Sequence, residues 1–185
     1  MLSENHVKTR GVHTAKECAL IAVFVALVIV AQIALSSLPG VEVVTVLFVS
    51  YSFTAGWKRG MLTATIFSLL RQIVFGFFPT VLILYLVYYN LLALCFGLIG
   101  GKIQKPYKWL PIIVVTACLG TVFFALIDNI LTPLWYSYGA QATKVYFISS
   151  LPFMIPHVIC TAVSVSVLFL PLNAVFSLFY KQNNI

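Results

Sequence analysis

The chain has 185 residues, of which 62% are hydrophobic and 8% are charged, and its mean hydropathy is +1.06. Soluble domains average about 45–50% apolar and about 25% charged residues, so a water-soluble protein of this composition could not cover its own surface. Lipid is therefore the expected solvent for most of the chain. Because a transmembrane helix needs about 20 residues, six such helices nearly fill the length and leave no room for a separate soluble catalytic or nucleotide-binding domain.

Apolar runs separated by turn signals predict an all-α membrane protein, a compact bundle of six transmembrane helices. A polar tail over residues 1–14 precedes the bundle, which covers residues 15–181. The expected helices span residues 15–37, 41–56, 60–78, 80–100, 110–131 and 152–180. Residues 132–150 form the longest connection that is not apolar, and we expect an external loop there. A β-barrel is not indicated, because its strands alternate in polarity over about ten residues, whereas these runs are continuously apolar.

The positive charge is concentrated in alternate connections, which predicts the topology of the bundle. Nine of the eleven basic residues lie in the tail, in the second and fourth connections and at the end of the last helix. These residues are Lys8, Arg10, Lys16, Lys58, Arg59, Lys102, Lys105, Lys108 and Lys181. Cytoplasmic connections are enriched in Lys and Arg, so we expect both termini in the cytoplasm. Topology and contact with anionic lipid thus explain the net charge of +7, and no nucleic-acid partner is expected.

The sequence shows no motif for catalysis, for a metal or for a cofactor. The four cysteines stand singly in apolar runs, without a C-x-x-C pair or a nearby His cluster, so neither a zinc site nor a disulfide framework is indicated. Gly100-Gly101-Lys102 is similar to the end of a P-loop, but Phe96 replaces its first glycine and Ile103 replaces its Ser or Thr. We expect no enzyme activity in this chain, and any ATP hydrolysis that drives transport would occur in another subunit.

Ionisable side chains inside the apolar runs mark the candidate binding site. Such groups cost on the order of 2.5–3.5 kcal/mol each in a membrane helix, so they face a bundle interior, pair with each other or bind a ligand. In the predicted topology the outer half of the bundle contains Glu42, Arg71, Asp128 and His157, with the polar and aromatic neighbours Thr45, Ser68, Tyr85, Tyr89, Asn129 and Trp135. These ten residues predict one outward-facing ligand site. The alternative is a structural ion pair between Arg71 and an acid, with tyrosines that only anchor the membrane interface.

The first predicted helix carries a stripe of small residues. Ala15, Ala19, Ala22 and Ala26 fall within an arc of about 60° at 100° per residue. Small residues let two helices approach closely, and van der Waals packing is what joins helices in lipid. The stripe lies in the predicted cytoplasmic half, away from the predicted site, so it is a candidate docking surface for a partner. Packing within its own bundle is the alternative.

With these features the chain resembles the substrate-binding (S) components of energy-coupling factor (ECF) transporters, which are bacterial vitamin importers. The resemblance covers nearly the whole chain and includes the six expected helices. It also rests on the motif Ala22-Val23-Phe24-Val25-Ala26, the Pro39 break, the Gly100-Gly101-Lys102 end of the fourth helix and the proline-flanked last helix.

The resemblance implies a subunit of the bacterial plasma membrane that binds a water-soluble vitamin or related micronutrient from outside. It also implies docking through Ala22 and Ala26 onto a membrane coupling subunit, with two ATPase subunits supplying the energy. Two other classes stay open. One is a self-sufficient secondary transporter or channel, with Glu42, Arg71 and Asp128 as an ion or proton path, although the cytoplasmic half is nearly free of ionisable groups. The other is a small membrane enzyme or assembly factor.

Overall fold

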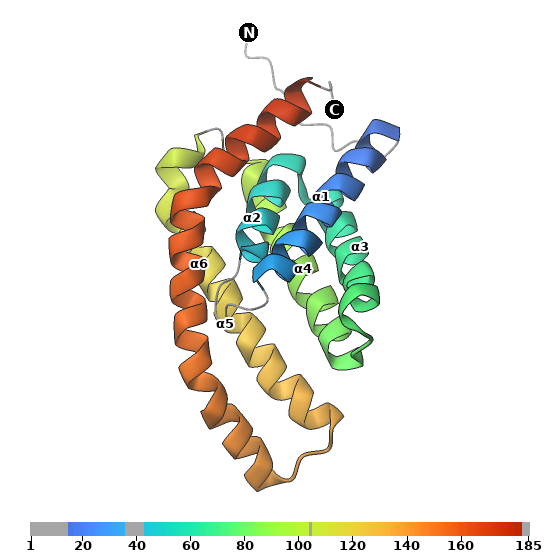
Figure 1. Cartoon of the computed structure of the whole chain (residues 1–185). Coiled ribbons are helices and arrows are strands. Elements are labelled where there is room, and N and C mark those ends of the chain that lie inside the picture. The colour runs from blue at the N-terminus through green and yellow to red at the C-terminus, as the bar shows by residue number, and fades with distance from the viewer. Residues whose placement is uncertain (1–14, 36–42, 104, 183–185) are drawn as a thin grey trace.

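The computed structural model describes residues 15–35, 43–103 and 105–182, with side chains described as far as Tyr180. Every element in these ranges is a helix, which confirms the all-α class for the described part of the chain. The helices are α1 (Ala15–Leu35), α2 (Val44–Ala55), α3 (Trp57–Phe75), α4 (Pro79–Gly100), the short 3-10 helix η1 (Pro106–Trp109), α5 (Leu110–Trp135) and α6 (Ala140–Gln182) (Figure 1). The predicted tail over residues 1–14, the Pro39 break and Glu42 lie outside the described residues.

Four stretches of the described chain are long and apolar enough to cross a membrane: α1, α4, η1 with α5, and α6. By contrast, α2 is apolar but has 12 residues, about 18 Å of helix, which is shorter than a hydrocarbon core of about 30 Å. α3 has 19 residues, and three of them are basic, namely Lys58, Arg59 and Arg71. The described chain is therefore compatible with an integral membrane protein, while the six crossings and their orientation remain predictions.

The connection between α5 and α6 is much shorter than the sequence predicts. Residues 136–139 alone join the two helices, so the prediction of a loop over residues 132–150 is wrong. Pro152 and Pro156, which suggested the start of the last helix, lie inside α6. Prolines are tolerated in membrane helices where neighbouring groups satisfy the freed backbone atoms. The polar side chains of this stretch suggested a loop, but two of them, Tyr146 and Ser150, form hydrogen bonds between α5 and α6.

The basic residues gather at one end of the bundle, which we call the basic end. At the top of Figure 1 lie the start of α1, the α2–α3 connection, the α4–α5 connection around η1 and the end of α6. These parts of the chain carry Lys16, Lys58, Arg59, Lys102, Lys105, Lys108 and Lys181. The α3–α4 and α5–α6 connections lie at the opposite end, and within the described residues that half has Arg71 and Lys144 as its basic residues. Such a separation is what a positive-inside topology requires.

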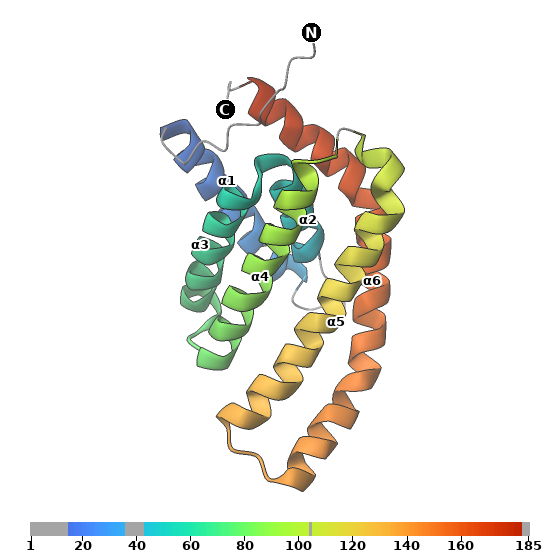
Figure 2. The same ribbon diagram turned by 180° about the vertical axis from the view of Figure 1, so that it is seen from behind.

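The short helix α2 lies in the middle of the bundle and forms its core (Figure 1, Figure 2). Ten of its twelve residues are buried, and it packs against α3, α4 and α6. The ring centroid of Phe48 lies 5.2 Å from that of Phe67 and 4.8 Å from that of Tyr89. Because longer helices enclose α2, its length does not have to match the thickness of a bilayer.

α6 is much longer than a simple crossing, and it covers the basic end. Its 43 residues correspond to about 65 Å of helix, roughly twice the hydrocarbon thickness. The helix is bent, and its C-terminal part, red in Figure 1, crosses the basic end. There Thr54 donates a hydrogen bond to Asn173 at 2.7 Å, and Tyr180 donates to Tyr51 at 3.1 Å. Pro171, where the sequence predicts a kink, lies inside α6.

Two glycines bring α4 against the end of α2 and the start of α3. A Cβ atom added to Gly97 would overlap the backbone of Trp57, and one added to Gly100 would overlap the carbonyl group of Phe53. Small residues allow backbones to approach this closely, which favours packing between membrane helices. The glycine-rich end of α4 therefore serves helix packing.

Replacing Gly97 by alanine should destabilise the bundle, because the new Cβ would push α4 away from Trp57. Overpacking of this kind costs about 1–3 kcal/mol. Gly101→Ala is the matched control, since the nearest atoms to a Cβ added there are 3.7 Å away. Thermal unfolding in detergent should show a lower melting temperature for Gly97→Ala and an unchanged one for Gly101→Ala. Equal melting temperatures of the two variants would contradict the close packing of α4 on α3.

Candidate functional site

Arg71 lies near the far end of α3 and is in contact with aromatic rings. It follows Trp57 at the basic end by fourteen residues, or about 21 Å of helix. Its guanidinium carbon lies 4.4 Å from the centroid of the Tyr85 ring and 4.9 Å from that of the Phe75 ring. Its Nε and Nη1 atoms are buried, and neither has a hydrogen-bond partner among the described residues. Arg71 is thus a half-buried cation with cation–π contacts and unpaired donors.

α4 places three tyrosines beside this cation. Tyr85, Tyr88 and Tyr89 follow i, i+3, i+4 spacing, which puts them on one face of the helix, and all three are buried. The hydroxyl of Tyr85 accepts a hydrogen bond from Gln32 Nε2 of α1 at 3.1 Å. Phe124 of α5 stacks on Tyr85 with ring centroids 5.9 Å apart and meets Tyr88 edge-on at 4.8 Å. The face of α4 therefore connects α3 to α1 and α5.

His157 of α6 completes this group, since its ring lies 6.3 Å from that of Phe124 in an edge-on arrangement. We call the whole group the Arg71 cluster; its members are Gln32, Arg71, Tyr85, Tyr88, Tyr89, Phe124 and His157. The cluster joins five helices in the half of the bundle remote from the basic end. It combines flat aromatic surfaces with a few polar groups, which is the composition of sites for small planar ligands.

Asp128 belongs to a different set of contacts. Its carboxylate accepts a 2.9 Å hydrogen bond from the hydroxyl of Tyr146 in α6 and another 2.9 Å bond from Thr132 within α5. Among the described residues no ion pair joins Asp128 to Arg71. The sequence predicted that these two side chains would meet in one site, but the described contacts of Asp128 are structural ones.

The same helix pair is joined at two further levels. Asn129 Nδ2 donates to the hydroxyl of Ser150 at 2.7 Å. Nearer the basic end, the buried hydroxyls of Thr121 and Thr161 lie 3.0 Å apart. We call these contacts, together with the Asp128–Tyr146 bond, the α5–α6 ladder. Hydrogen bonds between helices contribute to packing in lipid, so the ladder holds α5 and α6 together as a hairpin.

The structure also describes Thr45, Ser68 and Trp135, three further predicted site residues. Thr45 and Ser68 are fully buried, and the hydroxyl of Ser68 donates to a carbonyl of its own helix at 2.8 Å. Trp135 is 49% exposed at the end of α5, and Glu42 lies outside the described residues. Of the ten candidates, the structure brings together Arg71, Tyr85, Tyr89 and His157.

Three members of the cluster were not among the predicted site residues. Tyr88 shares the α4 face with Tyr85 and Tyr89, so the spacing of the tyrosines could have included it. Gln32 is an amide inside an apolar helix, and an intramembrane polar residue is itself a signal of a bundle interior. Phe124 carries no such signal, because it is one of 15 phenylalanines in the chain.

A buried ion pair at the basic end was also not predicted. Arg59 of α3 pairs with Glu17 of α1, and the two side chains are 12% and 6% exposed. The guanidinium of Arg59 lies 5.3 Å from the ring of Tyr180, which in turn donates a hydrogen bond to Tyr51. The pair therefore ties α1 and α3 to the end of α6, and its role is structural.

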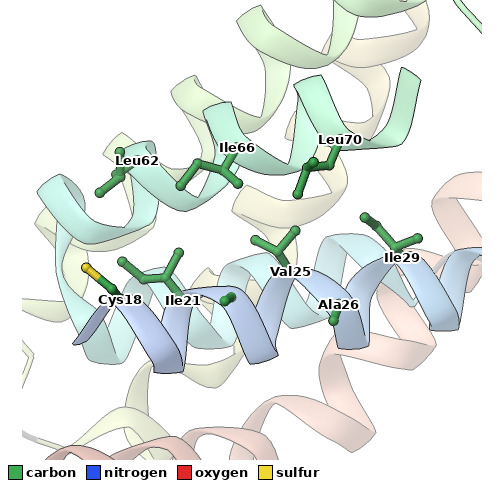
Figure 3. A pocket seen from close by; sticks show the side chains of 9 residues that line it. Cys18, Ile21, Val25, Ala26, Ile29, Leu62, Ile66 and Leu70 are labelled. Atoms are coloured by element: carbon green, nitrogen blue, oxygen red, sulfur yellow. The ribbon is translucent and has the colours of Figure 1, made fainter. Parts of the chain in front are cut away.

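The alanine stripe on α1 is exposed beside an apolar groove. Ala15, Ala19, Ala22 and Ala26 all belong to the exposed residues of the helix. Ala22 and Ala26 line a groove of about 310 Å³ between α1 and α3 (Figure 3). The other lining residues are Cys18, Ile21, Val25, Ile29, Leu62, Ile66 and Leu70. No helix of the described bundle covers the stripe, so its packing inside the bundle is not observed, and docking of a partner remains a prediction.

Comparison of the chain with models of protein families, with curated proteins and with solved structures gave no match. Within the described ranges, no three His, Cys, Asp or Glu side chains form a group that could hold a metal. Function must therefore be argued from the Arg71 cluster and the exposed alanine face.

Tyr146→Phe should destabilise the α5–α6 hairpin, because it removes a hydrogen bond to the Asp128 carboxylate. Such a bond between membrane helices contributes about 0.6–2 kcal/mol. Tyr136→Phe is the matched control, since Tyr136 is 52% exposed. Thermal unfolding of the single variants and of their combinations with Asp128→Asn gives a double-mutant cycle. Additive effects of Tyr146→Phe and Asp128→Asn would show that the bond does not contribute to stability.

Proposed function

We propose that this protein is a membrane-embedded binding subunit that captures a water-soluble vitamin or related micronutrient and delivers it to an ATP-driven ECF module. The resemblance of the sequence to S components motivates the proposal. The observation that carries it is the separation of two surfaces on one bundle. The Arg71 cluster lies in the half remote from the basic end, and the exposed alanine face lies in the half next to it.

In the proposed orientation the basic end faces the cytoplasm of a bacterial cell, because cytoplasmic connections are enriched in Lys and Arg. The Arg71 cluster then lies toward the outer surface, where a nutrient arrives. Arg71 is four residues before the end of α3, which is about 6 Å of helix. A ligand would therefore reach the cation through a short path from outside.

The Arg71 cluster offers two kinds of surface to such a ligand. The rings of Tyr85 and Phe124 would contact the flat faces of a planar molecule. The guanidinium of Arg71 and the amide of Gln32 would pair with its polar edges, as a few placed polar groups do in most small-molecule sites. In this proposal Asp128 supports the hairpin and does not bind the ligand.

The α5–α6 hairpin is the proposed gate. α5 has 26 residues and α3 has 19, or about 39 Å and about 28 Å of helix. The hairpin accordingly extends beyond the α3–α4 connection at the end remote from the basic end (Figure 2). Closing of such an element over a site excludes water. In this proposal the hairpin tip is the part that moves over the site.

The alanine face would dock onto a membrane coupling subunit, and two ATPase subunits would supply the energy. An exposed row of small residues beside an apolar groove favours close contact with another transmembrane helix. The face starts at the basic end, near the cytoplasmic side where ATPase subunits would act. The absence of a P-loop motif from the sequence fits ATP hydrolysis in a separate subunit.

Purified protein should retain or bind one small molecule without ATP, with an affinity on the order of nanomolar. The test is mass spectrometry of molecules released from the purified protein, followed by titration with a panel of water-soluble vitamins. If no compound co-purifies and none of the panel binds, the proposed function is wrong.

Replacing both Ala22 and Ala26 by tryptophan should lower uptake at least tenfold in cells that contain an ECF module, because the bulky rings would block docking. Ligand binding by the purified variant should be unchanged, since the stripe makes no described contact with the Arg71 cluster. Leu27→Trp is the matched control: Leu27 is 48% exposed and points about 100° away from Ala26 around the helix. Unchanged uptake in the double variant would contradict docking through this face.

A further inference from the structure

The charge balance of the described bundle leaves Arg71 without an acidic partner. The structure describes two acidic side chains, Glu17 and Asp128. Glu17 pairs with Arg59 at the basic end, and the carboxylate of Asp128 accepts hydrogen bonds from Tyr146 and Thr132. Neither is available to Arg71, whose guanidinium stays charged in a protein interior.

Contacts with aromatic rings offset only part of the penalty for this arrangement. The rings of Tyr85 and Phe75 lie 4.4 Å and 4.9 Å from the guanidinium carbon. Removing a cation from water costs more than such cation–π contacts return. The rings also do not accept the N–H hydrogen bonds of Nε and Nη1, both of which are buried without a partner in the described chain.

Two amides show the same pattern: Gln72, which follows Arg71 in α3, and Gln32, whose partner Tyr85 also contacts Arg71. Gln72 is 6% exposed. Its Oε1 accepts a hydrogen bond from the backbone N–H of Phe78 at 3.0 Å. Its Nε2 is buried and has no partner among the described residues. Gln32 donates to Tyr85, and its Oε1 is buried and likewise unpaired in the described part of the chain. A bound ligand or water can satisfy buried polar atoms that have no partner in the protein.

From these observations, and resting on the proposed function, we propose that the ligand is an acid: a small planar molecule whose carboxylate or phosphate group pairs with Arg71. An anionic oxygen would satisfy the charge of Arg71 and its free N–H groups at once, which is the strongest type of hydrogen bond available to an arginine. Gln72 Nε2, on the next residue of α3, supplies a second donor, and Gln32 Oε1 accepts an N–H or O–H from the ring of the ligand. Neutral vitamins would leave the cation uncompensated.

Matched pairs of charged and uncharged compounds test this inference at constant ionic strength. For carboxylates the pairs are nicotinate with nicotinamide, and biotin with biotinamide. For phosphates they are pyridoxal phosphate with pyridoxal, and flavin mononucleotide with riboflavin. Titration calorimetry on the purified protein should show that the bound compound is an acid and binds at least tenfold more tightly than its uncharged partner. The two sets of pairs distinguish a carboxylate from a phosphate.

Variants test whether Arg71 causes the preference for an acid over its uncharged partner. Arg71→Gln should remove the preference for the acid, and Arg71→Lys should keep part of it because the charge is retained. Lys144→Gln, which removes an exposed basic residue from the same half of the bundle, should leave the preference unchanged. If Arg71→Gln does not fold, the comparison of acids with uncharged partners on the wild-type protein still decides the question.

The possible failures are distinguishable. Tight binding of an uncharged vitamin with no preference for an acid overturns the inference while the proposed function stands, whereas binding of no compound overturns both. The inference also fails if Glu42 is the counter-ion of Arg71. In that case Glu42→Gln would lower the melting temperature, and the double variant with Arg71→Gln would restore it.

Discussion

Polar groups in a protein surrounded by lipid must be satisfied inside the protein, and this constraint organises the whole bundle. At the basic end, Glu17 and Arg59 form an ion pair and bring α1, α3 and α6 together. Along the α5–α6 ladder, hydroxyl, amide and carboxylate groups pair across two helices. Arg71 differs from Arg59, since it has ring contacts but no anionic partner in the described chain. This difference makes the Arg71 cluster the candidate site.

Packing around α2 sets where the Arg71 cluster lies. Glycines near the end of α4 hold that helix against the α2–α3 connection at the basic end. From there α4 runs beside α3, so its tyrosines reach the level of Arg71 toward the other end. The ring of Tyr89 lies between the core and the cluster: it contacts Phe48 of α2 on one side and Tyr85 on the other. The same helix thus joins a rigid core to the candidate site.

The distribution of polar contacts also bears on the secondary transporter or channel alternative. An ion or proton path would need ionisable groups linked through the bundle. In the described residues the polar contacts include the ion pair at the basic end, the α5–α6 ladder and the Arg71 cluster. Arg71 and Asp128, two of the three residues that this alternative names for the path, belong to different sets of contacts. The described contacts therefore show no continuous link between these two residues.

Much of the fold could be predicted because the signals are local. Apolar runs determined the helical class and gave the bounds of α1 and α4 closely, and the alternation of charge placed the basic residues at one end. The sequence also predicted that Arg71, Tyr85, Tyr89 and His157 lie at a similar level of the bundle, since level follows from position along a helix.

The tertiary structure decided which of these residues meet. The position of a residue along a helix does not define the face on which its side chain lies. Asp128 was therefore predicted at the level of Arg71, but its side chain belongs to the α5–α6 ladder. The extra turns of α5 and α6 are joined by hydrogen bonds such as Asn129 to Ser150, which connect residues 21 positions apart and leave no local pattern. Gln32 and Phe124 could not be predicted as members of the cluster for the same reason. Their partners lie on other helices, so only the packing of those helices brings them together.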